Sequence, residues 1–387
     1  MPESGIVEVA NYGRGREGLI PLWIGEGHWP TPAFIADAAT RALAAGETFY
    51  TWQRGIPELR QAIAGYTGRM FGRPFDPERF YVTIGGMHAL QIAMRIVSGP
   101  GDEVVVPTPA WPNFEAAIEV NGARAVALPM SPGPDGWHLD LARLEAAITP
   151  NTRAIVVNSP SNPTGWTASR HDLVRILGLA RQHGLWLIAD EIYQRFVFDP
   201  RLGGVEGRTA SFHDIMAEDD RILFLQTFSK NWAMTGWRIG WLEAPPALGP
   251  AIENLIQYTT SGVPAFIQRA AVTAIEDGEG LVAEHIALAR LNRDIVCEGL
   301  RATNVVELPS PPGAFYAFFS VDGVTDTRRL AMDLIDHANV GLAPGTAFGA
   351  GGGGHLRLCF LRDTAMLDEA IGRLATALPK IAARRAA

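Results

Sequence analysis

The chain has 387 residues, 47% of them hydrophobic, and a formal net charge of −8. This length exceeds one ordinary compact core, so we expect a large domain and a smaller one. The negative charge, which is spread without long charge runs, argues against a nucleic-acid-binding surface and against a polybasic membrane anchor.

Cysteine usage and the N-terminal segment indicate a cytoplasmic protein. Cys297 and Cys359 are the only cysteines, too few for a disulfide framework, and no segment has metal-ligand spacing. Residues 1–20 lack a basic start and an apolar segment, and no apolar run approaches the ~18 residues of a membrane span. We therefore expect a protein that acts on a small molecule, without metal, nucleic acid or membrane as partner.

Short β-rich apolar runs alternate with helical patterns between residues 80 and 242. Apolar residues in segments 89–97 and 172–182 recur at three and four positions, as on one face of a helix. Strands are predicted at 80–84, 103–107, 124–128, 154–158, 185–189, 222–227 and 238–242. This alternation predicts an α/β fold whose mostly parallel sheet is buried on both faces. Ligands of such sheets bind beyond the carboxyl ends of the strands, so the residues after each run are candidates for a site.

The C-terminal third follows a different order of elements. Helical patterns are found at 246–301, 327–338 and from residue 364, and strands are predicted at 314–321 and 355–360. We expect a large α/β domain at 46–280, and a small α+β domain formed by 1–45 together with 281–387. The glycine-rich run 349–354 does not lead from a strand into a helix, so it is predicted to be a loop.

Lysine is rare in this chain, which has 31 arginines but only Lys230 and Lys380. Lys380 lies in an Arg/Ala-rich tail, where a solvated charge needs no explanation. Lys230 lies in the loop 227–240, between two predicted strands. Arginine keeps its proton at neutral pH, whereas a buried lysine can lose it, and only the free amine attacks a carbonyl. Lys230 is therefore a candidate nucleophile, and the alternative is a surface lysine without a role.

The loop around Lys230 combines two hydroxyls and an arginine, which together suit a phosphate group. These side chains are Thr227, Ser229 and Arg238. The segment resembles the cofactor-lysine motif of fold-type I, class I/II aminotransferases, such as the aspartate and aromatic aminotransferases. The resemblance implies that pyridoxal 5′-phosphate forms a Schiff base with Lys230 and that Thr227, Ser229 and Arg238 hold its phosphate.

Asp190 and Tyr193 follow the predicted strand at 185–189. An aspartate after a strand is by itself typical of a turn or a helix cap. With tyrosine three positions later it resembles the D-x-x-Y motif of the same family. There the carboxylate pairs with the pyridine nitrogen and the phenol bonds the ring hydroxyl. A buried anion keeps that nitrogen protonated, which makes the cofactor an electron sink.

Two further loops resemble cofactor contacts of the family. Residues 158–165, Asn-Ser-Pro-Ser-Asn-Pro-Thr-Gly, resemble N-P-x-N-P-T-G, which implies that Asn162 bonds the ring oxygen and lies beside the substrate. Gly85, Gly86 and Met87 begin a predicted helix, whose first backbone N–H groups form an anion site. The family usually has a small or hydroxyl residue where Met87 stands.

Aromatic and arginine residues complete the resemblance. Trp111, which alone reads as a core or surface residue, matches the aromatic side chain that stacks on the pyridine ring and shields it from water. Gly25 matches a residue beside the substrate. Arg357 lies on an apolar strand and needs an anionic partner. An internal salt bridge is one explanation, and the family match implies the substrate α-carboxylate. Tyr50, followed by the family's G-x-x-x-L-R at 55–60, implies a phosphate contact in the partner subunit and therefore a homodimer.

These motifs predict an aminotransferase of amino-acid metabolism that moves an amino group from an L-amino acid to a 2-oxo acid. The amine of Lys230 is expected to act as general base, with Asp190 and Tyr193 as the other catalytic residues, in a ping-pong reaction. A β-lyase or a cyclopropane-forming synthase on the same fold is the alternative. A ligand-sensing regulator would need a DNA-binding module, and a nicotinamide enzyme would need a G-x-G-x-x-G fingerprint; neither is found.

The substrate side departs from the family pattern. The usual G-E-P-D-F reads Gly-Glu-Gly-His-Trp at residues 25–29, and Trp52 follows Tyr50. We expect His28, Trp29 and Trp52 to give a bulky, largely neutral lining. No lysine is available there to pair a second carboxylate, although an arginine or a protonated His28 would do so. The prediction is that neutral or aromatic donors are accepted alongside glutamate.

Overall fold

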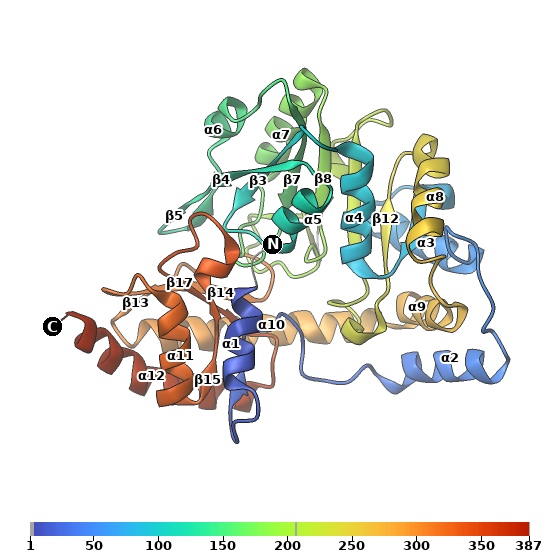
Figure 1. The fold of residues 1–387 in the computed structure, drawn as a ribbon. Helices are drawn as coiled ribbons and strands as arrows, with labels where there is room; N and C mark the ends of the chain where they lie inside the picture. Colours follow the sequence, from blue (N-terminus) through green and yellow to red (C-terminus); the bar gives the residue numbers. More distant parts are fainter. Residues whose placement is uncertain (1–3, 206, 387) are drawn as a thin grey trace.

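The structure, a computed structural model, describes residues 4–205 and 207–386. Its centre is a seven-stranded sheet in the order β2-β12-β11-β8-β7-β3-β4 (Figure 1). The strands are β2 (Phe80–Thr83), β3 (Glu103–Thr108), β4 (Arg124–Pro129), β7 (Thr152–Asn158), β8 (Trp186–Asp190), β11 (Ile222–Thr227) and β12 (Gly240–Glu243). β12 is antiparallel to both neighbours, and the other pairs are parallel. The predicted α/β fold with a mostly parallel sheet is confirmed.

Helices cover both faces of this sheet because successive strand residues point to opposite sides. Ile188 and Leu223 belong to the core under α4, α5 and α8, whereas Leu187 and Phe224 belong to the core that includes α7. At the β2 end, α3 and α9 pack on Val82. The bounds are α3 (Pro57–Phe71), α4 (Gly85–Val97), α5 (Asn113–Val120), α7 (Arg170–His183), α8 (Gly249–Thr259) and α9 (Ala265–Asp277).

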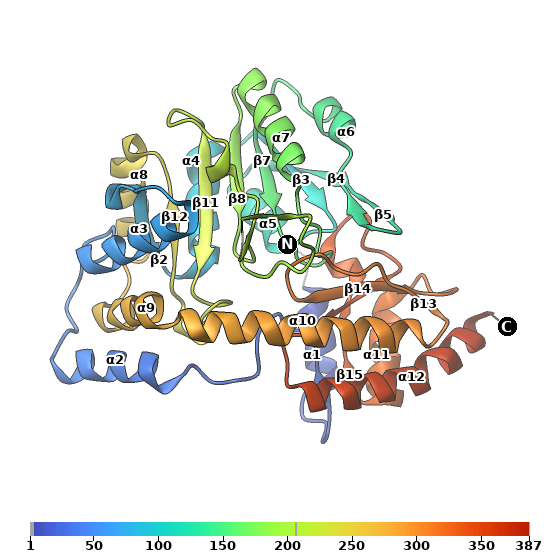
Figure 2. The ribbon, with the colours of Figure 1, turned by 180° about the vertical axis from the view of Figure 1, so that it is seen from behind.

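A second sheet lies in the C-terminal part, in the order β13-β14-β17-β16 with antiparallel pairs. Its strands are β13 (Val306–Glu307), β14 (Tyr316–Val321), β16 (Ala343–Pro344) and β17 (His355–Cys359), and the helices nearby are α11 (Thr327–Ala338) and α12 (Thr364–Ala386). Helix α10 (Glu279–Arg301) runs as one long rod between the regions of the two sheets (Figure 2). None of the described helices has the length and apolar character that crossing a membrane requires.

The N-terminal segment packs on this C-terminal part. Helix α1 (Gly5–Gly13) lies against α11, and β1 (Ile20–Pro21) pairs with β15 (Val340–Gly341). The chain then passes to α2 (Ala33–Ala44), which packs on α9 at the other end of the molecule (Figures 1 and 2). Residues 20–32 therefore connect the regions of both sheets. The remaining short elements are β5 (Ser131–Gly133), β6 (Gly136–His138), α6 (Leu141–Ala146), β9 (Gly203–Val205) and β10 (Arg208–Thr209).

Two predicted strands begin too early in the sequence. The strand expected from residue 238 begins at Gly240, and the strand expected from residue 314 begins at Tyr316. The cause is a turn in each case, because Arg238 has φ 54° and Ala314 has φ 58°. Backbone in this left-handed region cannot continue a strand.

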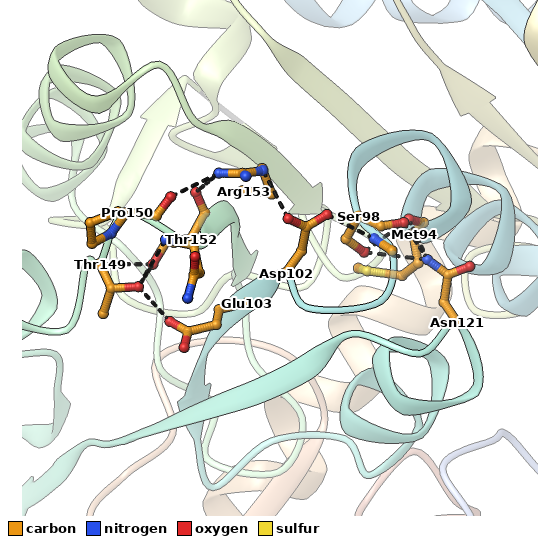
Figure 3. Close-up of polar contacts among 11 residues, drawn as sticks. Met94, Ser98, Asp102, Glu103, Asn121, Thr149, Pro150, Thr152 and Arg153 are labelled. Atoms are coloured by element: carbon orange, nitrogen blue, oxygen red, sulfur yellow. Dashed lines mark hydrogen bonds and ion pairs between the residues drawn. The ribbon is translucent and has the colours of Figure 1, made fainter.

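Polar side chains tie the loops at the edge where β3 and β7 begin (Figure 3). Arg153 pairs with Asp102 at 3.0 Å, and Thr149 Oγ1 donates to Glu103 Oε2 at 2.7 Å. Asn121 Nδ2 donates to the Met94 carbonyl at 3.0 Å, joining the end of α5 to α4. These contacts satisfy polar groups at one end of the strands and leave the opposite, carboxyl end for other residues.

Candidate active site

A cavity of about 340 Å³ lies where the carboxyl ends of the parallel strands meet the N-terminal segment and the second sheet. Asn158, Asp190 and Thr227 are the last residues of β7, β8 and β11, so the parallel sheet brings them to one edge. The residues proposed from the sequence that line the cavity are Gly25, Gly86, Met87, Trp111, Asn162, Asp190, Tyr193, Thr227, Ser229, Lys230, Arg238 and Arg357. Tertiary structure thus assembles them from segments far apart in the chain.

Lys230 lies inside this cavity, and its Nζ donates a hydrogen bond to the Gly25 carbonyl at 2.6 Å. Burial lowers the pKa of Lys230 from 10.5 to about 8, and the positive charges of Arg357 and Arg238 contribute to the decrease, while Cys359 and Glu26 oppose it. A substantial fraction of the amine is therefore neutral at pH 8. The chance surface lysine considered above is excluded by this location.

A group of positive backbone and side-chain donors faces the cavity beside Thr227. Gly85 has φ 72°, and a Cβ atom there would lie 2.5 Å from Arg238 Nη2, so the guanidinium sits directly against the first turn of α4. The N-terminal end of α4 and the guanidinium of Arg238 both carry positive charge. Arg238 forms no ion pair within the described residues. Thr227 Oγ1 and Ser229 Oγ are 2.9 Å apart. These donors suit a phosphate, which would complete them.

Asp190 is buried without a basic partner in the described part of the chain. Its side chain is 3% exposed, and Oδ1 accepts a hydrogen bond from the Ile192 N–H at 3.3 Å. Burial raises the pKa of Asp190 from 3.8 to about 7, against the opposing effect of the Ile192 hydrogen bond. A cationic group placed beside this carboxylate would restore its charged form. The protonated nitrogen of a pyridine ring fits this requirement.

Arg357 is also buried, at 3% exposed. Its Nη1 donates to Asn162 Oδ1 at 2.9 Å and its Nη2 to the Trp23 carbonyl, while Nε has no partner among the described residues. No carboxylate pairs with it in the described part of the structure, so the internal salt bridge considered from the sequence is not found. A guanidinium in this position can donate hydrogen bonds to the carboxylate of a bound molecule.

The aromatic residues take three different positions. Trp111 lines the cavity and packs edge-to-face on Phe114, with ring centroids 5.6 Å apart. Tyr193 lines it and is hydrogen-bonded through its hydroxyl to Tyr316 at 2.7 Å. Tyr50 is 93% exposed and does not line the cavity of its own chain. A role for Tyr50 at a phosphate therefore requires a second subunit.

The expected lining by His28, Trp29 and Trp52 is wrong for the cavity of a single chain. Trp29 stacks on His285 instead, with centroids 5.8 Å apart, and Trp52 is 64% exposed on the outer surface. His28 Nδ1 accepts from the Asp363 N–H at 3.0 Å, and burial lowers the pKa of His28 below 6.5. A neutral His28 outside the cavity cannot pair a second carboxylate.

Several cavity residues escaped the sequence analysis, namely Ile6, Trp23, Ile24, Glu26, Asn158, Ile192, Thr235 and Tyr316. Tyr316 is the clearest case because it is completely buried and opens strand β14, whose predicted range contained it. Its position depends on pairing with β17, where it lies opposite Cys359. The pairing of these strands was the missing signal.

Comparisons with known proteins agree on one family. The family model described as aminotransferase class I and II matches residues 20–374. The arginine–pyruvate transaminase AruH of Pseudomonas aeruginosa is 34% identical over 93% of this chain and 90% of its own length. The aspartate aminotransferase of Pyrococcus horikoshii is 31% identical over 98% and 95%. A mutant of Thermus thermophilus aspartate aminotransferase superposes with TM-score 0.89 at 33% identity, covering 98% of this chain and 97% of that one.

Proposed function

The chain belongs to the class I and II aminotransferases, which are pyridoxal-phosphate enzymes, and on that premise we propose that Lys230 is the residue that carries the cofactor. The amino group would move between an L-amino acid and a 2-oxo acid in a ping-pong reaction. The observation that carries this proposal is a partly neutral amine inside a cavity that also holds Asp190 and Arg357, two buried ionisable side chains that form no ion pair among the described residues.

Three sets of residues fit three parts of the cofactor and substrate. Asp190 suits the protonated ring nitrogen, since burial raises its pKa and it lacks a basic partner. Arg238 and the start of α4, with Thr227 and Ser229, suit the phosphate. Arg357 suits the α-carboxylate of the amino acid. Trp111, Asn162 and Tyr193 would contact the ring. Gly86 and Met87, at the start of α4, would belong to the phosphate site, and Gly25 would lie beside the substrate.

Pyridoxal phosphate, when bound, supplies a carbonyl for covalent attachment and a ring that withdraws electrons from the substrate Cα. Lys230 provides the neutral amine that would take the proton from the substrate Cα and deliver it to the former carbonyl carbon of the cofactor. Arg357 holds the α-carboxylate with its forked donors, which fixes the direction of the Cα–H bond relative to Lys230. Tyr193 would hold the ring oxygen by a hydrogen bond from its hydroxyl, and Trp111 would shield the ring from water.

The substrate side chain would meet a mainly neutral surface. The cavity residues without an assigned role include the apolar Ile6, Trp23 and Ile24 and the acidic Glu26. Of the cavity arginines, Arg238 lies at the proposed phosphate site and Arg357 at the proposed carboxylate site. Lys230 is the other basic side chain of the described lining and is assigned to the cofactor, so none is left for a distal carboxylate. We therefore expect neutral and aromatic donors to react alongside glutamate, without exclusive use of aspartate.

An exposed aromatic group favours assembly into a homodimer. Phe49, Tyr50 and Tyr258 are 85%, 93% and 84% exposed, and Trp52 is 64% exposed. Large aromatic side chains with this exposure are enriched at interfaces between subunits. A second copy of the chain would cover them and bring Tyr50 to the phosphate of its partner.

We also propose the domain division at residues 46 and 280, with α10 leading out of the large domain.

The experiment that tests the proposal replaces the lysines one at a time. Lys230→Ala should abolish transamination and the covalent, borohydride-reducible attachment of cofactor, because no other lysine lines the cavity. Lys230→Arg should fail as well, since a guanidinium does not lose its proton. The measurements are absorbance of the bound cofactor, peptide mapping after reduction, and release of 2-oxo acid from a panel of amino donors.

Lys380→Ala is the matched control, because it removes the remaining lysine of the chain at an exposed position on α12. This variant should retain parental absorbance and turnover. Reduced cofactor on any residue other than Lys230, or full turnover by Lys230→Ala, would reject the assignment. Products other than a 2-oxo acid would instead favour the β-lyase or synthase alternative.

A further inference from the structure

Tyr316 joins the residues proposed to bind cofactor with those proposed to bind substrate. It is completely buried at the start of β14 and lines the cavity. A Cβ atom on Gly25 would lie 2.1 Å from the Tyr316 hydroxyl, so the end of the phenol fills the space that a side chain at residue 25 would need. The guanidinium of Arg357 lies over the Tyr316 ring, 4.7 Å from its centroid.

The hydroxyls of Tyr316 and Tyr193 form a closed pair, with their oxygens 2.7 Å apart and their rings edge-to-face at 83°. Neither phenol has another hydrogen-bond partner within the described residues. A phenol has one proton to donate and lone pairs to accept. The pair therefore uses one proton internally and leaves the other free to point into the cavity.

Neighbouring charges decide which phenol donates. Burial raises the pKa of Tyr316, but the positive charge of Arg357 acts against this increase. Burial also raises the pKa of Tyr193 well above 10; Tyr316 and Asp190 add to this increase, and Arg357 opposes it. The guanidinium of Arg357 lies 4.7 Å from the centroid of the Tyr316 ring, and a positive charge at this distance makes the Tyr316 hydroxyl the better donor, so Tyr316 donates and Tyr193 accepts. The free proton is then that of Tyr193.

We propose that Tyr316 is a positioning residue whose hydroxyl, by donating to Tyr193, turns the Tyr193 proton toward the ring oxygen of the cofactor. This inference rests on the proposed function, because it assumes that Tyr193 contacts that oxygen. The ring of Tyr316 has a second role, because its cation–π contact holds the guanidinium of Arg357 in position. One side chain thus contacts both Tyr193, a proposed cofactor donor, and Arg357, the proposed carboxylate donor.

The hydroxyl is tested by the pH midpoint of the absorbance change of the lysine-bound cofactor. A proton donated to the ring oxygen stabilises its anionic form and lowers this midpoint. Tyr316→Phe keeps the ring but frees the Tyr193 proton to rotate, so the midpoint should rise by about 0.5 to 1 pH unit. Tyr193→Phe should raise it further, and the double variant should match Tyr193→Phe because the two hydroxyls act as one unit.

Tyr66→Phe is the matched control, since Tyr66 is a buried phenol that bonds Arg195 and does not line the active-site cavity. Its midpoint should equal that of the parent. For the ring of Tyr316, Tyr316→Leu should weaken the binding of 3-phenylpropionate, an unreactive carboxylate, about tenfold more than Tyr316→Phe does, which is within the range of a buried cation–π contact.

The outcomes separate this inference from the proposed function. An unchanged midpoint in Tyr316→Phe, or shifts that simply add in the double variant, would overturn the positioning role. A parent protein that shows no cofactor absorbance, or shows the same absorbance after Lys230→Ala, would overturn the proposed function itself. If Tyr316→Leu and Tyr316→Phe bind 3-phenylpropionate equally well, the proposed contact of the Tyr316 ring with Arg357 has no role in carboxylate binding.

Discussion

Asp190, Lys230 and Arg357 share one cavity without pairing with one another in the described structure. Burial raises the pKa of Asp190 to about 7 and lowers that of Lys230 to about 8, so each is pushed toward its neutral form near physiological pH. Burial of unpaired ionisable groups is costly and is retained mainly where a ligand uses them. These residues therefore suit a ligand that carries both positive and negative groups.

Replacement of Asp190 should separate stability from activity. Its folded-state pKa of about 7 lies above the usual value of 3.8, so the cofactor-free protein loses stability as pH rises from about 4 through 7 and stays at the lower level above that. Asp190→Asn cannot ionise. The cofactor-free variant should therefore unfold at a higher urea concentration than the parent at pH 8, with little difference at pH 4.

The same variant should lose most of its turnover, because an amide cannot hold the ring nitrogen protonated. We expect kcat to fall a hundredfold or more, about 2.7 kcal/mol, with cofactor still bound. Steady-state kinetics and urea unfolding at pH 4 and 8 measure both effects. Parental kinetics together with unchanged stability would return Asp190 to the role of a turn residue.

Arg357 should act on every amino donor alike. Arg357→Ala removes both forked donors and should lower kcat/KM at least a hundredfold for aspartate, glutamate, phenylalanine, leucine and alanine. Arg357→Lys keeps the charge without the fork and should give an intermediate loss. In the parent, aspartate should not exceed every neutral donor by more than about a thousandfold, roughly 4 kcal/mol. A larger preference would indicate a dedicated cation near the substrate side chain.

At the beginning of α4, the backbone of Gly85 lies very close to the side chain of Arg238 and to the backbone of Gly240. Gly85 combines φ 72° with a Cβ position only 2.5 Å from Arg238 Nη2, and a Cβ on Gly240 would lie 3.1 Å from the Gly85 carbonyl carbon and the Gly86 nitrogen. Glycine at these positions allows the turn, the helix and the guanidinium to share one small space. The strand predicted from residue 238 begins only at Gly240 for the same reason, because Arg238 is part of this turn.

Gly85→Ala should weaken cofactor binding more than it weakens the fold. The added methyl group would displace Arg238 and strain the backbone, so we expect the cofactor dissociation constant to rise at least tenfold. Gly178→Ala is the matched control, because Gly178 lies inside α7 with no neighbour within 4 Å. The control should be as stable as the parent or slightly more so. Unchanged cofactor affinity in Gly85→Ala, measured by fluorescence titration, would contradict this account.

At the scale of the whole molecule, residues 20–32 connect the regions of the two sheets across the cavity. Arg357 donates to the Trp23 carbonyl, Lys230 to the Gly25 carbonyl, and Thr31 Oγ1 to the Ala233 carbonyl at 2.6 Å. The cavity is thus closed on one side by backbone. The exposed Tyr50 follows this segment and α2, which places it outside the cavity of its own chain.

Mixed dimers should show which subunit supplies Tyr50. Tyr50→Ala and Lys230→Ala chains should each be weakly active or inactive alone. When the two are co-expressed with different tags and purified as a pair, one of the two sites regains both Lys230 and Tyr50 if Tyr50 acts across the interface. The mixed dimer should then recover about half of the parental activity per dimer, by simple counting of intact sites. Recovery absent from a verified mixed dimer would place Tyr50 outside the partner's site.

The α/β class and the loops that carry polar residues could be predicted from the sequence, because strand periodicity, turn residues and motif spacing are local properties. Asp190 and Thr227 end strands and Asn162 follows one, and parallel strands bring such residues to one edge. Three features could not be predicted in this way: the contact of Tyr316 with Tyr193, the hydrogen bond of Lys230 to the Gly25 carbonyl, and the positions of Trp29 and Trp52 outside the cavity. These depend on how segments far apart in the chain pack together, which no local pattern records.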